Sequence, residues 1–264
     1  MSAGEPFWIV GCGAMAGSML SRWLDTGTLE PASVTVIDPA RPKLPGVRSL
    51  AALPDEAPPT RLMLGVKPQM LGDVAAQVAA VVGPGTQLLS ILAGTRRATL
   101  AAQFDRAAAV VRVMPNLPVA IGQGAVALHA PGVDRAPLDT LFAPLGLVEW
   151  IDDEQLFDAV TALSGSGPAF LYRFAEALAK GGTAMGLDEA QADRLARATV
   201  AGAAALAKAS PEPLGTLADR VASKGGSTRE GLNALDEHAA LDRVVAAALR
   251  AAEARNRALA TPPD

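Results

Sequence analysis

The chain has 264 residues, of which half are hydrophobic and 19% are charged. This composition excludes a disordered chain, because enough apolar side chain is present to offset the entropy lost on folding. The length allows two modest domains, and 27 acidic against 23 basic residues give a net charge of −4. That balance lacks the basic surface of a nucleic-acid binder, so we expect a small-molecule ligand and no nucleic acid.

Metal-ligating residues are scarce in this sequence. Cys12 is the only cysteine, which excludes an internal disulfide and a cysteine-built zinc site. His129 and His238 lie more than a hundred residues apart and neither has a histidine partner one helical turn away. We therefore expect no metal.

Neither an export signal nor a membrane span is expected. Glu5 and Pro6 stand where a secretory signal would carry lysine or arginine. The alanine-rich stretch 198–207 is bounded by Arg197 and Lys208, which leaves far fewer than the roughly 20 apolar residues of a spanning helix. The sequence thus predicts a cytoplasmic protein that does not enter a membrane.

Short apolar runs alternate with helical or turn-rich stretches as far as residue 151. Runs of this length with such spacing are typical of a largely parallel sheet covered by helices. The predicted strands are 7–10, 33–37, 61–66, 87–92, 109–114, 124–129 and 147–151.

After residue 151 the chain is rich in alanine, leucine and arginine at helical spacing, and it reads as all helix. We therefore predict two domains, 1–151 and 152–264. The alanine-rich helices offer more apolar surface than one core stripe needs, so a subunit interface is expected there. A compact monomeric bundle is the alternative.

A glycine turn follows the first predicted strand. Residues 11–17 read G-C-G-A-M-A-G and lead into a helical stretch, the order of a dinucleotide-binding turn. Gly11 would permit the tight turn, Gly13 would let a pyrophosphate approach the backbone, and Ala16 or Gly17 would let helix and strand pack closely. Ala14 and Met15 complete the predicted cofactor-binding turn, and we interpret Cys12 as a small structural residue within it.

Asp38 ends the next strand, 21 residues after Gly17, where a carboxylate can accept hydrogen bonds from an adenosine ribose. Two more strands end in residues suited to face a cofactor, because ligands bind at the carboxyl ends of parallel strands. The first set is Val66, Lys67 and Pro68, although a solvated Lys67 is equally compatible with the sequence. The second set is Met114, Pro115 and Asn116, which would line the nicotinamide.

Two glycine-containing segments stand out in the helical half. Ser164-Gly165-Ser166-Gly167-Pro168 interrupts or opens a long helix, with a proline suited to the first helical turn. The stretch 222–228 leads glycines into a helix whose first N–H groups can hold an anion such as a carboxylate. A plain helix connection with Ser227 or Thr228 as N-cap is the alternative.

Taken in order, the segments GCGAMAGSM, GVKPQ, RVMPN, ALSGSGPAF and VASKGGSTREGL resemble pyrroline-5-carboxylate reductases over essentially the whole chain. The resemblance implies a Rossmann-like dinucleotide-binding domain followed by an all-helical dimerisation domain, an α/β protein that forms homodimers or dimer-based oligomers. It also implies NAD(P)H-dependent reduction of 1-pyrroline-5-carboxylate to L-proline. One departure is Lys224, where the family usually has proline; it removes rigidity from that loop but adds charge beside the anion site.

The resemblance further implies the substrate-binding residues. Gly225, Gly226, Ser227 and Thr228 would hold the substrate carboxylate, and the Thr228 hydroxyl, the expected catalytic group, would contact the ring nitrogen. Ser164, Gly165 and Ser166 would complete the site. A cyclic imine is basic enough to arrive protonated, so positioning rather than a strong acid is required.

Two other functions stay open. A relative acting on another cyclic imine or on a 2-hydroxy acid would need a base, for which Lys180 is the nearest candidate. A nucleotide-binding regulator without catalysis is the other. The cofactor is expected to be NADPH or NADH, since Asp38 favours a ribose hydroxyl and the nearby Arg41 and Lys43 favour a phosphate.

Overall fold

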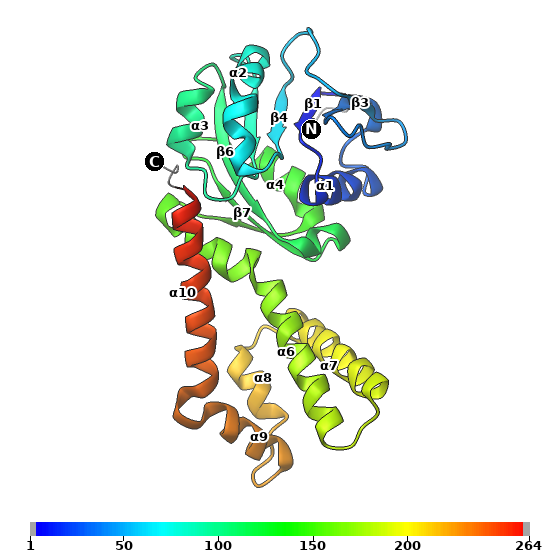
Figure 1. Ribbon diagram of the computed structural model, residues 1–264, viewed down its shortest axis with the longest axis vertical. Helices are drawn as coiled ribbons and strands as arrows, with labels where there is room; N and C mark the ends of the chain where they lie inside the picture. The colour runs from blue at the N-terminus through cyan, green and yellow to red at the C-terminus, as the bar shows by residue number, and fades with distance from the viewer. Residues whose placement is uncertain (1–3, 261–264) are drawn as a thin grey trace. The chain divides into compact units, whose positions relative to one another are not determined.

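The computed structural model describes residues 4–260. Two compact units are present, one holding the chain up to Ser166 together with the residues from Ala252 onward, the other Gly167–Ala251. Helix α10, Ala240–Ala260, belongs to both units and is drawn in the orange-to-red end of the colour range in Figure 1. The predicted boundary at residue 151 stays a prediction.

The first unit contains one eight-stranded sheet in the order β3-β2-β1-β4-β5-β6-β7-β8. Strands β1 to β6 pair in parallel, β7 runs antiparallel to β6, and β8 is parallel to β7. The strands are β1 Phe7–Val10, β2 Val34–Ile37, β3 Arg48–Leu50, β4 Arg61–Leu64, β5 Gln87–Ser90, β6 Ala109–Pro115, β7 Gly124–His129 and β8 Gly146–Trp150. The predicted helix-covered, largely parallel α/β sheet is confirmed, and β3 was missed because this edge strand has three residues of which only Leu50 is apolar.

Helices cover both faces of the sheet, and β1 shows why its sequence is apolar throughout (Figure 1). Phe7 and Ile9 point into one core with Trp23 of α1 and Phe142 of α4. Trp8 and Val10 point into the opposite core beside α2 and α3. Successive side chains of a strand face opposite ways, so a strand buried on both faces cannot alternate with polar residues.

The chain contains α-helices and shorter helical turns, whose bounds follow. The α-helices are α1 Ala14–Asp25, α2 Leu71–Val81, α3 Arg97–Gln103, α4 Ala136–Phe142, α5 Phe157–Val160, α6 Gly167–Ala184, α7 Glu189–Ala209, α8 Leu214–Arg220, α9 Ser227–Asp236 and α10 Ala240–Ala260. The 3-10 turns are η1 Pro31–Ser33, η2 Pro68–Met70, η3 Leu117–Ile121, η4 Ala143–Leu145, η5 Glu154–Leu156 and η7 Glu237–Ala239, and η6 Thr161–Gly165 is a π-helical turn.

The second unit is all helix in its described residues, as the sequence predicted. Its buried residues are small, namely Gly182, Ala192, Ala196 and Ala222. Large apolar side chains instead lie on its surface: Leu171, Tyr172, Leu195, Leu206, Leu214 and Val244 are each more than half exposed. No described helix is both long enough and apolar enough to cross a membrane.

Candidate active site

The sheet order places a ligand site at the carboxyl ends of β1 and β4. The chain leaves β1 for β2 on one side and reaches β4 on the other, so these neighbouring strands mark the point where the strand order reverses. Loops that leave two such strands in opposite directions open a crevice between them. Gly11 follows β1 and Gly65 follows β4 at this point.

Gly11 and Gly65 pack against each other too closely for side chains. Gly11 has φ +84°, and a Cβ there would lie 2.7 Å from both Cγ1 and the backbone nitrogen of Val66. A Cβ on Gly65 would lie 2.4 Å from the Gly11 carbonyl oxygen and 2.9 Å from the Ala16 Cβ. Ala16 therefore sets the close approach of helix and strand. Gly17 does not, because its Cβ would meet only ordinary contacts at 3.9 Å.

Helix α1 begins directly after this turn, with Gly13 as N-cap in an extended conformation. The N–H groups of Ala14, Met15 and Ala16 come in its first turn, where no intrahelical acceptor exists. A Cβ on Gly13 would have no atom within 4 Å, so the space in front of the helix is open. Free amides, a positive helix end and an open approach fit the diphosphate of a dinucleotide.

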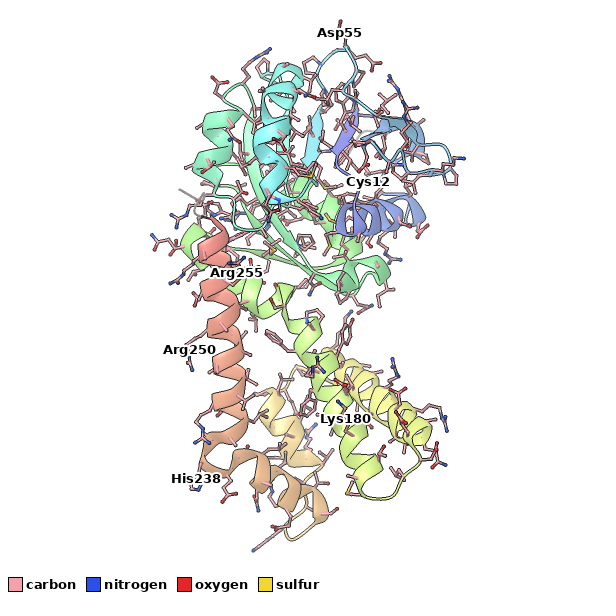
Figure 2. All side chains as sticks on the ribbon, viewed as in Figure 1. Cys12, Asp55, Lys180, His238, Arg250 and Arg255 are labelled. Atoms are coloured by element: carbon pink, nitrogen blue, oxygen red, sulfur yellow. The ribbon has the colours of Figure 1, made fainter. Side chains whose placement is uncertain are left out.

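Asp38 fixes the turn from the neighbouring strand. Its Oδ2 accepts a hydrogen bond of 2.8 Å from the Cys12 N–H, and its Oδ1 accepts one of 2.8 Å from the Ala40 N–H. Burial, and then the Asp38 charge, raise the pKa of the Cys12 thiol above its ordinary value. A raised pKa disfavours the reactive thiolate of Cys12, which is labelled in Figure 2, and this supports its interpretation as a structural residue.

The other predicted cofactor residues follow β4 and end β6. Val66, Lys67 and Pro68 follow β4, and Lys67 is an exposed N-cap of η2. Met114 and Pro115 end β6 and are buried, as is Asn116 directly after them. Their contact with a cofactor stays a prediction.

The structure brings Asn116 together with the predicted substrate turn. Its Nδ2 donates to the Ser164 carbonyl oxygen at 3.0 Å, while its Oδ1 accepts from the Ala125 N–H at 2.8 Å. Ser164 and Gly165 lie in the π-helical turn η6, and Ser166 N donates to Thr161 O at 3.0 Å. The sequence predicted an interruption before α6 here, and the structure shows it as this π-helical turn.

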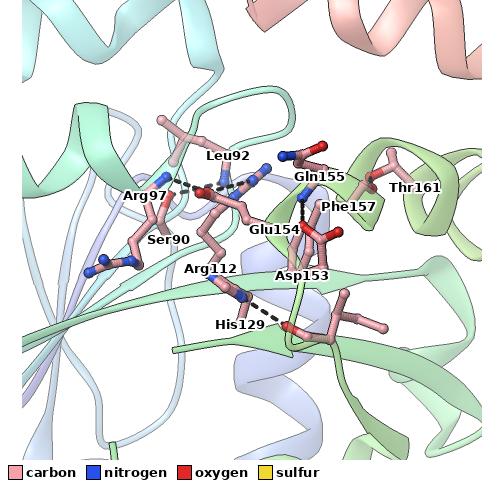
Figure 3. Close-up of polar contacts among 11 residues, drawn as sticks. Ser90, Leu92, Arg97, Arg112, His129, Asp153, Glu154, Gln155, Phe157 and Thr161 are labelled. Atoms are coloured by element: carbon pink, nitrogen blue, oxygen red, sulfur yellow. Dashed lines mark hydrogen bonds and ion pairs between the residues drawn. The ribbon is translucent and has the colours of Figure 1, made fainter. Parts of the chain in front are cut away.

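A partly buried ion pair that the sequence analysis missed anchors the same segment to the sheet (Figure 3). Glu154 Oε1 accepts from Arg112 Nη1 at 2.9 Å and from the Arg97 N–H at 2.5 Å. The Arg112 guanidinium also lies 4.4 Å from the centre of the Phe157 ring. An arginine inside the apolar strand 109–114 was the signal, because a buried cation needs a partner.

Electrostatics at this pair are set by burial and by the two hydrogen bonds. Burial lowers the pKa of the Arg112 guanidinium, and Glu154 opposes that shift. Burial alone would raise the pKa of Glu154, but the hydrogen bonds from Arg97 and Arg112 outweigh it and hold this pKa below its ordinary value. A cavity of about 490 Å³ borders the pair, with Arg96, Asp158 and Arg257 among its lining residues.

In the helical unit, the stretch predicted to bind an anion leads into α9. Gly225 has φ +71°, and Gly226 is the N-cap, where a Cβ would lie 2.5 Å from the Ser223 Oγ. The alternative that Ser227 or Thr228 is the N-cap is wrong, because both lie inside the helix, in its first turn. Their side chains are exposed, which leaves the Thr228 hydroxyl accessible to a ligand.

Glu212, which precedes α8, is a second residue that the sequence analysis missed. Its Oε1 pairs with Arg220 Nη2 at 2.5 Å, whereas its Oε2 is buried and has no hydrogen-bond partner among the described residues. A buried carboxylate oxygen without a donor is costly to the folded protein. An acidic residue between two prolines gave no signal of this in the sequence.

Known proteins match the chain along most of its length. A sequence profile described as pyrroline-5-carboxylate reductase dimerisation matches residues 154–259. Pyrroline-5-carboxylate reductase 3 of Danio rerio is 34% identical over 94% of this chain and 91% of its own. The pyrroline-5-carboxylate reductase of Pisum sativum is 35% identical over 92% of this chain and 94% of its own. The chain belongs to the pyrroline-5-carboxylate reductase family.

Solved structures of pyrroline-5-carboxylate reductases have the same fold. The Coxiella burnetii structure is 25% identical with a TM-score of 0.86, and it covers 98% of this chain and 100% of its own. The Streptococcus pyogenes structure is 26% identical with a TM-score of 0.78, over 96% and 98%. The Plasmodium falciparum structure, which has NADP bound, is 24% identical with a TM-score of 0.84 over 97% and 98%. The predicted architecture of a Rossmann-like domain followed by a helical dimerisation domain is confirmed.

Lys180, the candidate base of the hydroxy-acid alternative, does not support that function. Lys180, labelled in Figure 2, is 71% exposed and pairs with Glu176 Oε1 at 2.8 Å on the surface of α6. A solvated, ion-paired ammonium is a poor general base, so it does not suit the oxidation of a 2-hydroxy acid. Lys224 is exposed in the loop before α9, whose Gly225 keeps the left-handed conformation of the turn.

Proposed function

We propose that this protein reduces 1-pyrroline-5-carboxylate to L-proline at the expense of NAD(P)H. The observation that carries the proposal is the 34% identity to a pyrroline-5-carboxylate reductase over 91% of that enzyme, which spans both the glycine turn and the helical half. When bound, the reduced nicotinamide supplies the hydride for the imine carbon.

The dinucleotide fits residues of the first unit. The free N–H groups of Ala14, Met15 and Ala16 would hold its diphosphate, and Asp38 would take the adenosine ribose. The ends of β4 and β6, with Val66, Lys67 and Pro68 on one strand and Met114 and Pro115 on the other, would border the nicotinamide. The nearby Arg41 and Lys43 are exposed, so either NADH or NADPH is proposed as donor.

The substrate carboxylate fits the amides that begin α9. Gly226 leaves the first turn open, and the N–H groups of Ser227 and Thr228 have no intrahelical acceptor. The Thr228 hydroxyl would hydrogen-bond the ring nitrogen and hold the imine carbon in place for hydride arrival. Because the imine is protonated before it binds, orientation lowers the barrier and no strongly acidic side chain is needed.

Assembly as a homodimer is part of the proposal. The family's dimerisation profile covers the helical half, and large apolar side chains lie exposed there. Contiguous exposed apolar surface marks an interaction site. We propose that the helices of two copies cover this surface and that each active site draws on both.

The test is an absorbance assay of NADH and NADPH consumption with pyrroline-5-carboxylate, alongside a reaction without substrate. A parallel assay offers NAD⁺ or NADP⁺ with a 2-hydroxy acid. We expect consumption only with the imine, and recovery of L-proline as product. Folded protein that consumes neither cofactor with this substrate, or that oxidises the hydroxy acid instead, would refute the proposal.

A further inference from the structure

Ser164 carries a backbone carbonyl that its own helix cannot pair in the ordinary way. In an α-helix this oxygen would accept from the N–H four residues later, which is residue 168. That residue is Pro168, the second residue of α6, and proline has no N–H. The chain instead forms the π-helical turn η6 at this point, as Ser166 N donates to Thr161 O at 3.0 Å.

Asn116 supplies the missing donor. Its Nδ2 lies 3.0 Å from the Ser164 carbonyl oxygen, and the residue is only 8% exposed. The opposite end of the same amide accepts from the Ala125 N–H of β7 at 2.8 Å, which fixes its orientation. A side chain anchored to the sheet at one end and to the turn at the other sets the distance between them.

This bond is the second of two attachments from one strand. Arg112 within β6 holds Glu154 at 2.9 Å, and Asn116 directly after β6 holds Ser164. The segment 154–164 is therefore tied to the sheet near both of its ends. Its second end carries the turn 164–166 to the carboxyl end of β6.

We propose that Asn116 is a positioning residue, which holds the substrate turn 164–166 at the end of β6 through the carbonyl that Pro168 leaves unpaired. The inference rests on the proposed function and deepens it. It differs from the sequence interpretation of Asn116 as a lining of the nicotinamide, because one end of the amide is bound to β7 and the other donates to Ser164.

The first experiment replaces the donor and keeps the shape. Asn116→Asp retains an acceptor for the Ala125 N–H but offers the Ser164 carbonyl no N–H. We expect kcat/KM for pyrroline-5-carboxylate to fall by about tenfold or more, with the Kd for NAD(P)H, measured by calorimetry without substrate, within about threefold of the wild type. If Asn116→Asp does not fold, Asn116→Ser, which cannot span the gap, is measured in its place.

The matched control is Asn256→Ser, because Asn256 also donates to a helical carbonyl, that of Asp158, at 3.5 Å. It should leave kcat/KM within about threefold. If the Asn116 variant binds NAD(P)H more weakly by the same factor by which its kcat/KM falls, Asn116 is a cofactor contact. If its kinetics are unchanged, the hydrogen bond to Ser164 does not affect catalysis. Either result overturns the proposal. Wild-type protein inactive on the imine would instead refute the proposed function.

A second variant separates carbonyl pairing from positioning. Adding Pro168→Ala to the Asn116 variant returns an N–H four residues after Ser164, so the helix can pair that carbonyl itself. The Asn116 variant alone should unfold at a lower temperature than the wild type, because it leaves the Ser164 carbonyl without a donor. In the double variant we expect the thermal midpoint to recover toward the wild type while kcat/KM stays low, because nothing then ties the turn to β6. Recovery of kcat/KM together with the midpoint would show that pairing alone matters and would overturn the proposal.

Discussion

The pair formed by Arg112 and Glu154 gives a stability prediction with a defined size and sign. Glu154→Gln keeps the shape of the side chain and one oxygen for the Arg97 and Arg112 donors, but it removes the charge that offsets the Arg112 cation. The Arg112 side chain is 6% exposed and that of Glu154 is 25% exposed, so solvent replaces little of the lost interaction.

Removing one partner of a buried ion pair costs about 3–5 kcal/mol, and each of the two retained neutral hydrogen bonds returns about 1 kcal/mol. We therefore expect the free energy of unfolding to fall by about 1–3 kcal/mol. At roughly 2–4 °C per kcal/mol, the thermal midpoint should fall by about 2–12 °C.

The pH dependence follows from the lowered pKa of Glu154 in the folded protein. A carboxylate with a lowered folded pKa stabilises the protein above its unfolded pKa, near 4.5, and that stabilisation disappears as the pH falls through the folded pKa. The stability difference between wild type and Glu154→Gln should therefore be constant near neutral pH and shrink below about pH 5.

Urea denaturation at fixed protein concentration, from pH 7 down to the acid limit of folding, measures both effects. Glu56→Gln is the matched control, because Glu56 makes the same type of contact with Arg48 at 2.6 Å while both side chains are nearly half exposed. It should change stability little at any pH. A Glu154→Gln chain as stable as the wild type, or equally sensitive to acid, would show that this pair anchors nothing.

Three further predictions concern the proposed activity. Thr228→Ala should lower kcat by about ten- to a hundredfold, whereas Thr228→Ser, which keeps a hydroxyl, should lower it much less. If steady-state kinetics show no change in kcat/KM for Thr228→Ala, Thr228 has no catalytic role. The kcat/KM values for NADH and NADPH should lie within about a hundredfold of each other, and Asp38→Asn should shift the ratio toward NADPH; an unchanged ratio would mean that Asp38 serves only the Cys12 turn. Light scattering should give a dimer or larger assembly through residues 187–259, and an active species of 26.9 kDa would contradict this.

Features with local causes could be predicted from the sequence. The seven longer strands were visible because each carries a run of apolar residues, and six of them are largely buried, whereas β8 has no buried residue. The glycine turn was visible because Gly11 needs a positive φ between strand and helix. Strand β3 carries no such run, since its three residues lie at the sheet edge.

Features that depend on distant residues could not be predicted. Arg112 within an apolar strand indicated that an acidic partner is required, but Glu154 is 42 positions away and no sequence pattern near Arg112 identifies it. Asn116 offered a donor and an acceptor, and its attachment to Ser164 appears only once β6 and η6 are placed in space. The N-cap of α9 is Gly226 rather than Ser227 or Thr228, because the glycine lets the backbone turn tightly over Ser223.

The mutual contact of Gly11 and Gly65 has a consequence for ligand affinity. The Gly11 carbonyl fills the space of a side chain at Gly65, and Val66 fills the space of one at Gly11, so this end of the crevice cannot close further. A turn already in its final shape loses little conformational entropy when a diphosphate arrives, and that preorganisation appears directly as tighter binding. The two glycines are also interdependent, since a larger residue at either position displaces the other. Adaptation of this scaffold to a different dinucleotide must therefore take place in the exposed loop after Asp38, where Arg41 and Lys43 have room to change.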